Sequence, residues 1–317
     1  MCALRIVFCG TPEFAVPSLA RLAADPGVTI EAVITQPDRP SGRGRKISDS
    51  PVKETALRAG LQVFQPESIK SEASQEFLNR IAPDAVVIIA YGQIVPKRLL
   101  SIPRLGWLNL HASLLPRYRG AAPIHWAIAN GESTTGLTTM QIDAGMDTGP
   151  ILEQLAIEIG PEETAPELGA RMSQAGAELI TQSLLRLERG EISAVAQHSE
   201  EASYAPILKK EDGRIAWSQS ARQIYNRMRG FTPWPGTYST FRGQTCHIWG
   251  RPAPLTNVQS ELLSPGEIVF VARNVYARCG LDSFLQLESL QLEGRKRVTA
   301  AEFANGARLA ESERFSR

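Results

Sequence analysis

Residues 85–90 read AVVIIA, an unbroken apolar run with the length of one β-strand. A strand that is apolar at every position, and not only at every second one, is covered on both faces. Such strands occur almost only in parallel sheets that carry helices on both sides. The run therefore predicts a strand inside a doubly wound α/β sheet.

Strand-like and helix-like segments alternate on both sides of this run, which is typical of strands joined by crossover helices. Residues 4–8 (LRIVF) end at a sharp break, Gly10-Thr11-Pro12, before a helix pattern begins. The other segments are strand-like at 30–35, 107–110, 137–142 and 151–159, and helix-like at 16–24, 72–81 and 165–188. We therefore predict a Rossmann-like, doubly wound and mostly parallel sheet in residues 1–189.

The pattern changes in the last third of the chain. Residues 190–206 are mixed and polar, and we interpret them as a linker. Short strand-like runs separated by Gly, Pro and Asn then follow a helix pattern near residues 220–228, and they occupy residues 236–241, 245–249, 267–272, 275–278 and 284–292. Many short strands with turn residues between them predict a small OB-like β-barrel in residues 207–317.

The composition is that of an ordinary globular chain. Its 317 residues are 43% hydrophobic and 21% charged, enough for two domains with buried cores. No run of eighteen apolar residues occurs, the start of the chain lacks the pattern of a secretory signal, and the 4 cysteines and 4 histidines are scattered. We expect a cytoplasmic monomer without a membrane span, a disulfide framework or a bound metal.

The net charge of +1 conceals an asymmetry between the two halves. Residues 207–317 hold 16 Lys and Arg against 10 Asp and Glu, a net charge of +6, whereas residues 1–206 hold 18 against 23, a net charge of −5. A basic domain could bind a polyanion such as a nucleic acid. A modest charge difference between two ordinary domains is the alternative.

Two polar residues close one of the predicted strands. Asn109 and His111 are two positions apart, so both side chains leave the same side of the strand. They lie at its carboxyl end, where open α/β sheets place their ligands. An amide and an imidazole can both donate hydrogen bonds to a carbonyl oxygen that gains negative charge. The alternative is a strand end whose polar residues only cap a turn.

Two loops strengthen the functional interpretation of that strand end. Residues 113–123 (SLLPRYRGAAP) follow His111 directly as an extended segment broken by Pro and Gly. Residues 143–150 (DAGMDTGP) form a second loop, with Asp143 and Asp147, between two alternating strands. A carboxylate from this loop could orient His111 or accept a proton. Asp and Gly between strands are also common in simple turns.

Together these segments resemble the formyltetrahydrofolate-dependent transferases. The resemblance is carried by Asn109-x-His111, by SLLP at 113–116 and by DAGMDTG at 143–149, in this order and spacing. It covers essentially the whole chain, with further matches at 8–14 (FCGTPEF), 35–40 (TQPDRP), 214–217 (RIAW) and 231–236 (FTPWPG). The catalytic triplet shows no departure from the family pattern.

The resemblance implies that 10-formyltetrahydrofolate donates a formyl group to an amine without a metal. Asn109 and His111 would stabilise the oxyanion of the tetrahedral intermediate, while Asp147 would hold His111 and help to pass the proton. The pterin would lie between the loop at 91–93 and the segment at 140–147. The residues that would contact the folate are Tyr91, Gly92, Ser113, Leu114, Leu115, Pro116 and Asp143.

The amine that the resemblance favours is that of methionine esterified to initiator tRNA. Residues 39–46 (RPSGRGRK) combine glycines with Arg39, Arg43, Arg45 and Lys46, whose charges match phosphates. In the family, the matching loop enters the acceptor end of the tRNA. A solvated basic loop without a ligand is the alternative.

Three aromatic residues could belong either to a core or to a binding site. Phe14, close to the first loop, is a candidate wall of a methionine pocket, and it is equally a candidate core residue. We expect Trp234 and Trp249 to belong to the core of the second domain rather than to stack on bases.

Other functions remain open at this point. The acceptor could be a small-molecule amine, or the same triplet could direct water to the formyl carbon, as in a formyltetrahydrofolate hydrolase. A non-catalytic RNA-binding protein would explain the basic half but not the triplet. A dinucleotide-dependent reductase is disfavoured, because Gly10-Thr11-Pro12 lacks the glycine fingerprint and Pro12 has no N–H for a phosphate.

Overall fold

The computed structural model describes residues 3–41, 46–255, 263–271, 273–310 and 313–316. The chain forms two compact units, each assembled from separate stretches. The first comprises Met1–Pro123, Thr134–Glu158 and Glu167–Pro206, and the second comprises Ile124–Ser133, Ile159–Pro166 and Ile207–Arg317. Residues 190–206, which we interpreted as a linker, thus cluster with the first unit.

The first unit is built on a seven-stranded sheet with the order β5-β2-β1-β6-β7-β8-β9. The pairs from β5 to β7 are parallel, and the pairs β7–β8 and β8–β9 are antiparallel. The strands are β1 (Leu4–Gly10), β2 (Val28–Ile34), β5 (Val63–Phe64), β6 (Ala85–Ile89), β7 (Trp107–His111), β8 (Thr134–Gln141) and β9 (Ile151–Glu158). The prediction of a doubly wound, mostly parallel sheet is confirmed.

Strand β6 explains why the apolar run at 85–90 predicted this fold. All of its residues are buried, because β1 and β7 flank it and helices cover both faces of the sheet. On one face, Val86 and Ile88 belong to a core cluster with Phe77 of α3 and Leu99 of α4. Burial of an aliphatic side chain contributes about 1.5–3 kcal/mol, so this core dominates the stability of the unit.

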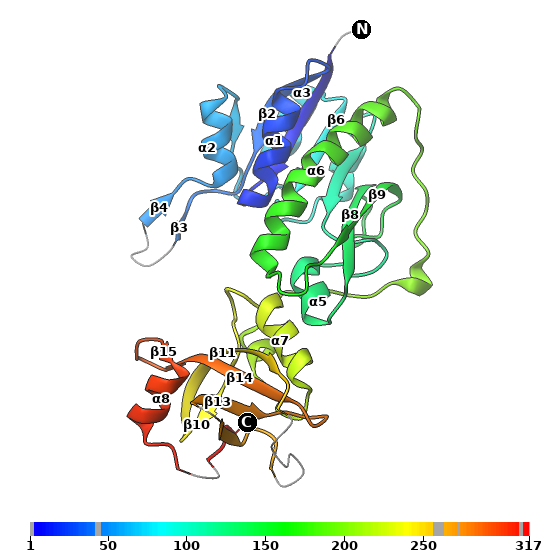
Figure 1. Cartoon of the computed structure of the whole chain (residues 1–317). Coiled ribbons are helices and arrows are strands. Elements are labelled where there is room, and N and C mark those ends of the chain that lie inside the picture. The colour runs from blue at the N-terminus through cyan, green and yellow to red at the C-terminus, as the bar shows by residue number, and fades with distance from the viewer. Residues whose placement is uncertain (1–2, 42–45, 256–262, 272, 311–312, 317) are drawn as a thin grey trace. The chain divides into compact units, whose positions relative to one another are not determined.

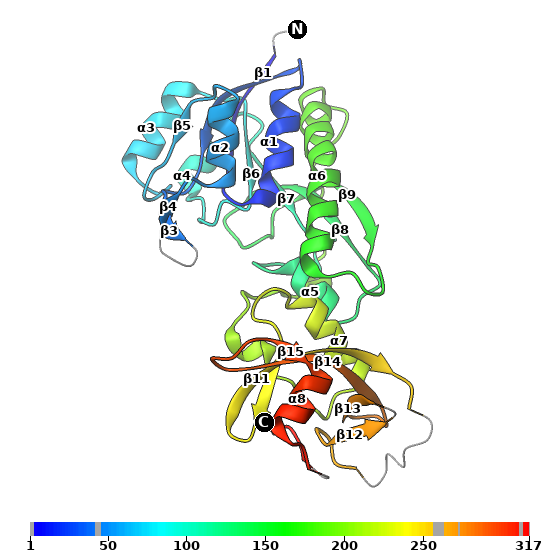
Figure 2. The same ribbon diagram turned by 60° about the vertical axis from the view of Figure 1, so that its left-hand side comes forward.

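Helices α1 and α6 lie side by side over the opposite face of the sheet, as both ribbon views show (Figures 1 and 2). Arg21 of α1 forms an ion pair of 2.9 Å with Glu178 of α6. The helices of this unit are α1 (Val16–Ala23), α2 (Pro51–Arg58), α3 (Glu72–Ile81), α4 (Lys97–Leu100) and α6 (Ala165–Glu188) apart from its first two residues, with a short 3-10 turn, η1 (Glu13–Ala15), before α1. Coverage of both faces by helices buries most residues of the parallel strands β1, β2, β6 and β7.

The basic segment at 39–46 is not a plain loop. Strand β3 (Arg39–Ser41) pairs antiparallel with β4 (Lys46–Ser48), which makes the segment a β-hairpin (Figure 1). Lys53 of α2 binds the carboxylates of Asp38, just before β3, and Asp49, just after β4. The two ends of the hairpin are thereby tied to one helix. Arg43 and Arg45 lie outside the described residues.

The second unit contains an antiparallel sheet with the order β10-β11-β14-β13-β12, to which β15 adds by pairing with β14. The chain end connects the two edges of this sheet. Ser316 exchanges backbone hydrogen bonds with Thr240 of β10, and Ile268 of β12 donates to Glu313 O at 2.8 Å. The strands are β10 (Tyr238–Phe241), β11 (Gln244–Ala253), β12 (Ile268–Val271), β13 (Asn274–Arg278), β14 (Phe284–Leu292) and β15 (Val298–Thr299). The sheet therefore closes into the predicted β-barrel.

Helices α5 (Pro123–Ala129), α7 (Ala221–Gly230) and α8 (Ala300–Ala307) belong to the second unit apart from the first residue of α5. Ile224 of α7 and Phe303 of α8 enter the core of the barrel. Trp234 does not, since its side chain is 54% exposed in the turn after α7, so the core interpretation of Trp234 is wrong. Trp249 is only partly buried.

No helix in the described part of the chain is long and apolar enough to cross a membrane. Cys9, Cys246 and Cys279 are buried free thiols. Burial raises the pKa of Cys246 to about 11.

Candidate active site

The carboxyl end of β7 carries the two polar side chains that the sequence singles out. Leu110 points to the face covered by α6, where a Cβ on Gly176 would lie 2.5 Å from Leu110 Cδ2. Because side chains alternate along a strand, Asn109 and His111 point to the other face. His111 is buried and Asn109 is half-buried.

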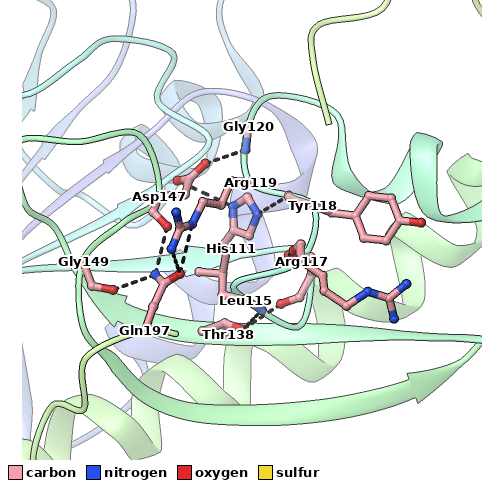
Figure 3. Close-up of polar contacts among 11 residues, drawn as sticks. His111, Leu115, Arg117, Tyr118, Arg119, Gly120, Thr138, Asp147, Gly149 and Gln197 are labelled. Carbon is pink, nitrogen blue, oxygen red and sulfur yellow. Dashed lines mark hydrogen bonds and ion pairs between the residues drawn. The ribbon is translucent and has the colours of Figure 1, made fainter. Parts of the chain in front are cut away.

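Each ring nitrogen of His111 has its own surroundings. Nε2 lies 3.0 Å from the carbonyl oxygen of Tyr118 (Figure 3). A carbonyl oxygen only accepts, so Nε2 carries the proton in the neutral ring. Nδ1 then presents a lone pair, and it lies 3.7 Å from Asp147 Oδ1. One ring nitrogen therefore faces a backbone carbonyl, and the other faces the Asp147 carboxylate.

Asp147 is held in place from its far side. Its Oδ2 accepts a hydrogen bond of 2.8 Å from the backbone N–H of Gly120. The backbone of Asp147 has a φ of 54°, in the left-handed region that Asp tolerates better than most residues. The structure thus brings together His111, the last residue of β7, and Asp147 of the loop between β8 and β9, and leaves Oδ1 facing the imidazole.

The Asn109 amide has no hydrogen-bond partner among the residues that the structure describes. Its backbone belongs to the ladder with Ile88 and Met140, so only the side chain is free to act. A half-buried amide with an unused donor can bind a developing oxyanion without first breaking another bond.

The loop at 113–116 is fixed by hydrogen bonds within the protein. Ser113, which is completely buried, donates to Arg117 O at 2.6 Å, and Leu115 N donates to Thr138 Oγ1 at 3.1 Å. Leu115 and Pro116 are buried and Leu114 is partly buried. Little of this loop except Leu114 is therefore open to a ligand, so its predicted folate contacts stay a prediction.

The other predicted folate residues lie in two further loops. The Tyr91 ring is in the core, 2% exposed, and burial raises the pKa of its phenol. Gly92, which follows it, has a φ of 85°. Asp143 Oδ1 accepts hydrogen bonds from Gly145 N and Thr148 Oγ1, so this carboxylate caps its own turn. Because the Tyr91 ring is buried, contacts between Tyr91 and a folate would have to come from the Tyr91 backbone.

Two apolar side chains stand out in the same two loops. Ile94 is 74% exposed and Met146 is 61% exposed. Exposed apolar side chains in loops that also carry polar groups are typical of ligand sites, because a flat ring can cover them.

A cavity of about 850 Å³ opens at the carboxyl ends of β1, β2 and β6. Its lining includes Thr11, Gln36, Arg39, Gly92 and Gln93. The cavity therefore brings together Arg39, predicted to bind tRNA, and Gly92, predicted to bind folate.

The remaining predicted residues that the structure describes are Phe14, Arg39 and Lys46. Phe14 lies in η1, partly buried, and its carbonyl accepts a hydrogen bond from Ser173 of α6. Arg39 is exposed, and Lys46 is the first residue of β4. No group of three or more His, Cys, Asp or Glu residues that could hold a metal occurs among the described residues.

The sequence did not reveal two groups that complete the site. Tyr118 acts through its carbonyl oxygen and Gly120 through its N–H, so neither side chain could signal the role. Gly120 did offer an indirect signal. Its φ is 117°, and a Cβ there would lie 2.7 Å from Ala205 O, which explains why only glycine fits.

Comparisons with known proteins agree with this geometry. A family profile described as "Formyl transferase" matches residues 4–184, and one described as "Formyl transferase, C-terminal domain" matches residues 207–308. A methionyl-tRNA formyltransferase of Solibacter usitatus is 50% identical over 312 residues, with 98% of each chain covered. Another, of Koribacter versatilis, is 49% identical over 315 residues, again with 98% of each chain covered.

Solved structures share the fold at much lower identity. WlaRD, a sugar 3N-formyl transferase solved in the presence of dTDP and 5-N-formyl-THF, superposes with a TM-score of 0.63 at 18% identity. The match covers 93% of this chain and 100% of WlaRD. Taken with the two profiles and the full-length relatives, the chain belongs to the formyl transferase family, in the group of the methionyl-tRNA formyltransferases.

Proposed function

We propose that this enzyme transfers the formyl group of 10-formyltetrahydrofolate to the amino group of methionine on initiator tRNA. The observation that carries the proposal is the meeting of Asn109, His111 and Asp147 at one strand end. The relatives that match over the whole chain, and whose names state this activity, support the choice of substrate.

In the reaction that we propose, the methionine nitrogen attacks the formyl carbon, and the bond between that carbon and N10 of the folate breaks. The formyl oxygen becomes an oxyanion on the way. The Asn109 amide donates to it, and His111, when protonated on Nδ1, offers a second donor on the same side of β7. Preorganised donors of this kind are typically worth about 3–4 kcal/mol each.

Asp147 is the group that moves the proton. Its Oδ2 is engaged by Gly120 N–H, whereas Oδ1 faces Nδ1 of His111 at 3.7 Å. Oδ1 accepts the proton that the attacking amine loses, with His111 sharing it, and the pair returns a proton to N10 as the folate leaves. Every proton taken from the amine is thereby delivered to the leaving group.

The site suits a folate by its chemistry. A pteridine and its benzoyl ring are flat and largely apolar, and the exposed side chains of Ile94 and Met146 offer surfaces of that kind. WlaRD, which shares the fold, was solved with a formyl-folate compound. We propose that the loops at 91–94 and 143–147 hold the donor.

Two basic surfaces favour tRNA over a small amine. The hairpin β3–β4 begins at Arg39, which also lines the large cavity. On the barrel, the exposed Arg297 stacks over Trp249, with its Cζ 3.9 Å from the ring centroid, and its Nε donates to Ser289 Oγ at 2.7 Å. A guanidinium ordered in this way can bind a phosphate with little loss of entropy.

The acceptor and the competing functions can be separated by one experiment. The purified chain is mixed with 10-formyltetrahydrofolate labelled in the formyl group, and with methionyl initiator tRNA, glycinamide ribonucleotide or no amine. We expect labelled N-formylmethionine on the tRNA and little labelled formate. Formylation of glycinamide ribonucleotide alone would favour the small-amine alternative, and formate release without any amine would favour a hydrolase.

We further propose that the enzyme works as a monomer in the cytoplasm, where initiator tRNA is charged. Asn109, His111 and Asp147 all belong to one compact unit of the chain.

A further inference from the structure

The Gln197 side chain uses every hydrogen-bonding position that an amide has. Its Nε2 donates to Asp147 O at 2.9 Å and to Gly149 O at 2.7 Å (Figure 3). Its Oε1 accepts from Arg119 Nε at 3.1 Å and from Arg119 Nη2 at 2.6 Å. Gln197 thus connects the loop that carries Asp147 to the loop that carries Tyr118 and Gly120.

Arg119 is a buried arginine whose guanidinium is paired with the neutral amide of Gln197, and with no carboxylate among the described residues. It is only 3% exposed, and in the described part of the chain no carboxylate lies within ion-pair distance of its guanidinium. Burying a charge without a counter-charge is costly, so its hydrogen bonds to Gln197 have to be maintained. The positive charge also polarises the Gln197 amide, which strengthens the two bonds that Nε2 donates.

The contacts close a ring around the catalytic carboxylate. Gly120 N–H holds Asp147 Oδ2, Gln197 holds Asp147 O, and Arg119, next to Gly120, holds Gln197. The loop of Arg119 is itself anchored, because Arg119 N donates to Ser203 O and Ala205 N donates to Arg119 O. Asp147 is thus held at both its main chain and its side chain.

We propose that Gln197, oriented by Arg119, is a positioning residue that sets the distance between Asp147 and His111. The inference rests on the proposed function, since it assigns Gln197 to the same proton transfer. Asp147 sits at a φ of 54°, which costs free energy unless neighbouring contacts maintain it. Without the bonds from Nε2, the loop relaxes and Oδ1 moves away from Nδ1.

Substitution of Gln197 by Glu separates positioning from simple structural support. A Glu side chain keeps a partner for Arg119, with an added opposite charge, but it has no N–H to donate to Asp147 O and Gly149 O. We expect Gln197→Glu to fold and to lower kcat about tenfold or more, with KM values for folate and tRNA within about twofold of wild type. Gln197→Ala should lower kcat at least as much.

The neighbouring His198 provides the matched control. Its side chain is 76% exposed and its Nδ1 lies 3.4 Å from Glu200 Oε1, so His198→Ala should retain wild-type kcat. The second readout is a double-mutant cycle with Asp147→Asn. If Gln197 acts through Asp147, Gln197→Glu should cause little further loss of kcat in that background.

The results distinguish the two proposals. Wild-type kcat in Gln197→Glu, or losses that multiply in the double mutant, would overturn the positioning role while the wild type still formylates tRNA. A wild-type chain that formylates no tRNA would instead overturn the proposed function, and the inference with it.

Discussion

His111 divides two tasks between its two ring nitrogens. The bond from Nε2 to Tyr118 O is buried and fixes the orientation of the ring, while Nδ1 faces Asp147. A histidine that only filled space would not need a carboxylate at 3.7 Å. The tautomer therefore follows from the backbone of the loop after β7, and the proton transfer that we propose depends on the loop before β9.

Asn109 offers the clearest test of the oxyanion interaction. Because its amide makes no hydrogen bond within the described residues, Asn109→Ala removes a donor without breaking a structural contact. We expect the thermal midpoint to stay near that of wild type and kcat to fall about a hundredfold or more. Asn109→Asp, which keeps the size but loses the donor, should behave alike. A kcat within threefold of wild type in both variants would argue against this role.

The sequence predicted residues at strand ends better than it predicted their partners. Asn109 and His111 follow from strand alternation and from the position of the carboxyl end. The approach of Asp147 depends on how the loop between β8 and β9 folds back, which no local pattern encodes. Tyr118 acts through its backbone and Gln197 lies in a polar segment without periodicity, so neither could be found from residue type. Gly120 offered only the indirect signal of being a glycine.

At the scale of elements, the hairpin β3–β4 is held at its base by one side chain. Lys53 is mostly buried, and it binds Asp38 and Asp49 on the two sides of the hairpin. Gln65 adds a hydrogen bond to Asp38 at 2.8 Å. The sequence predicted a loop here because Pro and Gly are poor strand formers. The short pairing of β3 with β4 depends on the contacts of Lys53 with Asp38 and Asp49, which we call the tether.

Loss of the tether should weaken tRNA binding more than catalysis. Lys53→Met removes the shared cation and leaves two carboxylates that repel each other. We expect KM for the tRNA to rise several-fold with kcat changed by less than about twofold, since none of Asn109, His111 and Asp147 lies in the hairpin. The control is Arg58→Met, which removes the same charge from an exposed position of α2. Equal KM values in the two variants would contradict the role of the tether.

The stability of the tether should also depend on pH. The hydrogen bond from Lys53, followed by that from Gln65, lowers the pKa of Asp38. A lowered carboxyl pKa contributes stability above the ordinary range of Asp, and this stability is lost as the pH falls through the lowered value. Hydrogen exchange of the amides at 48–53 should therefore accelerate, relative to the intrinsic rate, only below the ordinary Asp pKa. Acceleration already near pH 6 would contradict this assignment.

At the scale of the whole molecule, the charge asymmetry matches a division of tasks. The acidic first part carries the groups that we propose to act on the formyl carbon, and the basic second part forms a closed barrel. The alternation of short strands and turns was enough to predict the barrel. The sequence did not show which segment closes the barrel, because closure depends on residues 313–316 returning to pair beside both β10 and β12.

Arg297 tests whether the barrel contacts RNA. If it binds a phosphate, Arg297→Gln should raise KM for the tRNA and lower the slope of log KM against log salt concentration by about 1. Arg251, also exposed on the barrel but paired with Glu288 at 3.4 Å, provides the control. An unchanged salt slope in Arg297→Gln would exclude this contact.

The most direct test of the account is a single-turnover reaction with the enzyme in excess over methionyl initiator tRNA, run for wild type and for Asp147→Asn. Asn keeps the size of the side chain and tolerates the left-handed backbone, but it cannot accept the proton. The account predicts N-formylmethionyl-tRNA from the wild type, and formation at least about a hundredfold slower from the variant with unchanged tRNA binding. Equal rates in the two proteins, or no formylated tRNA from the wild type, would contradict it.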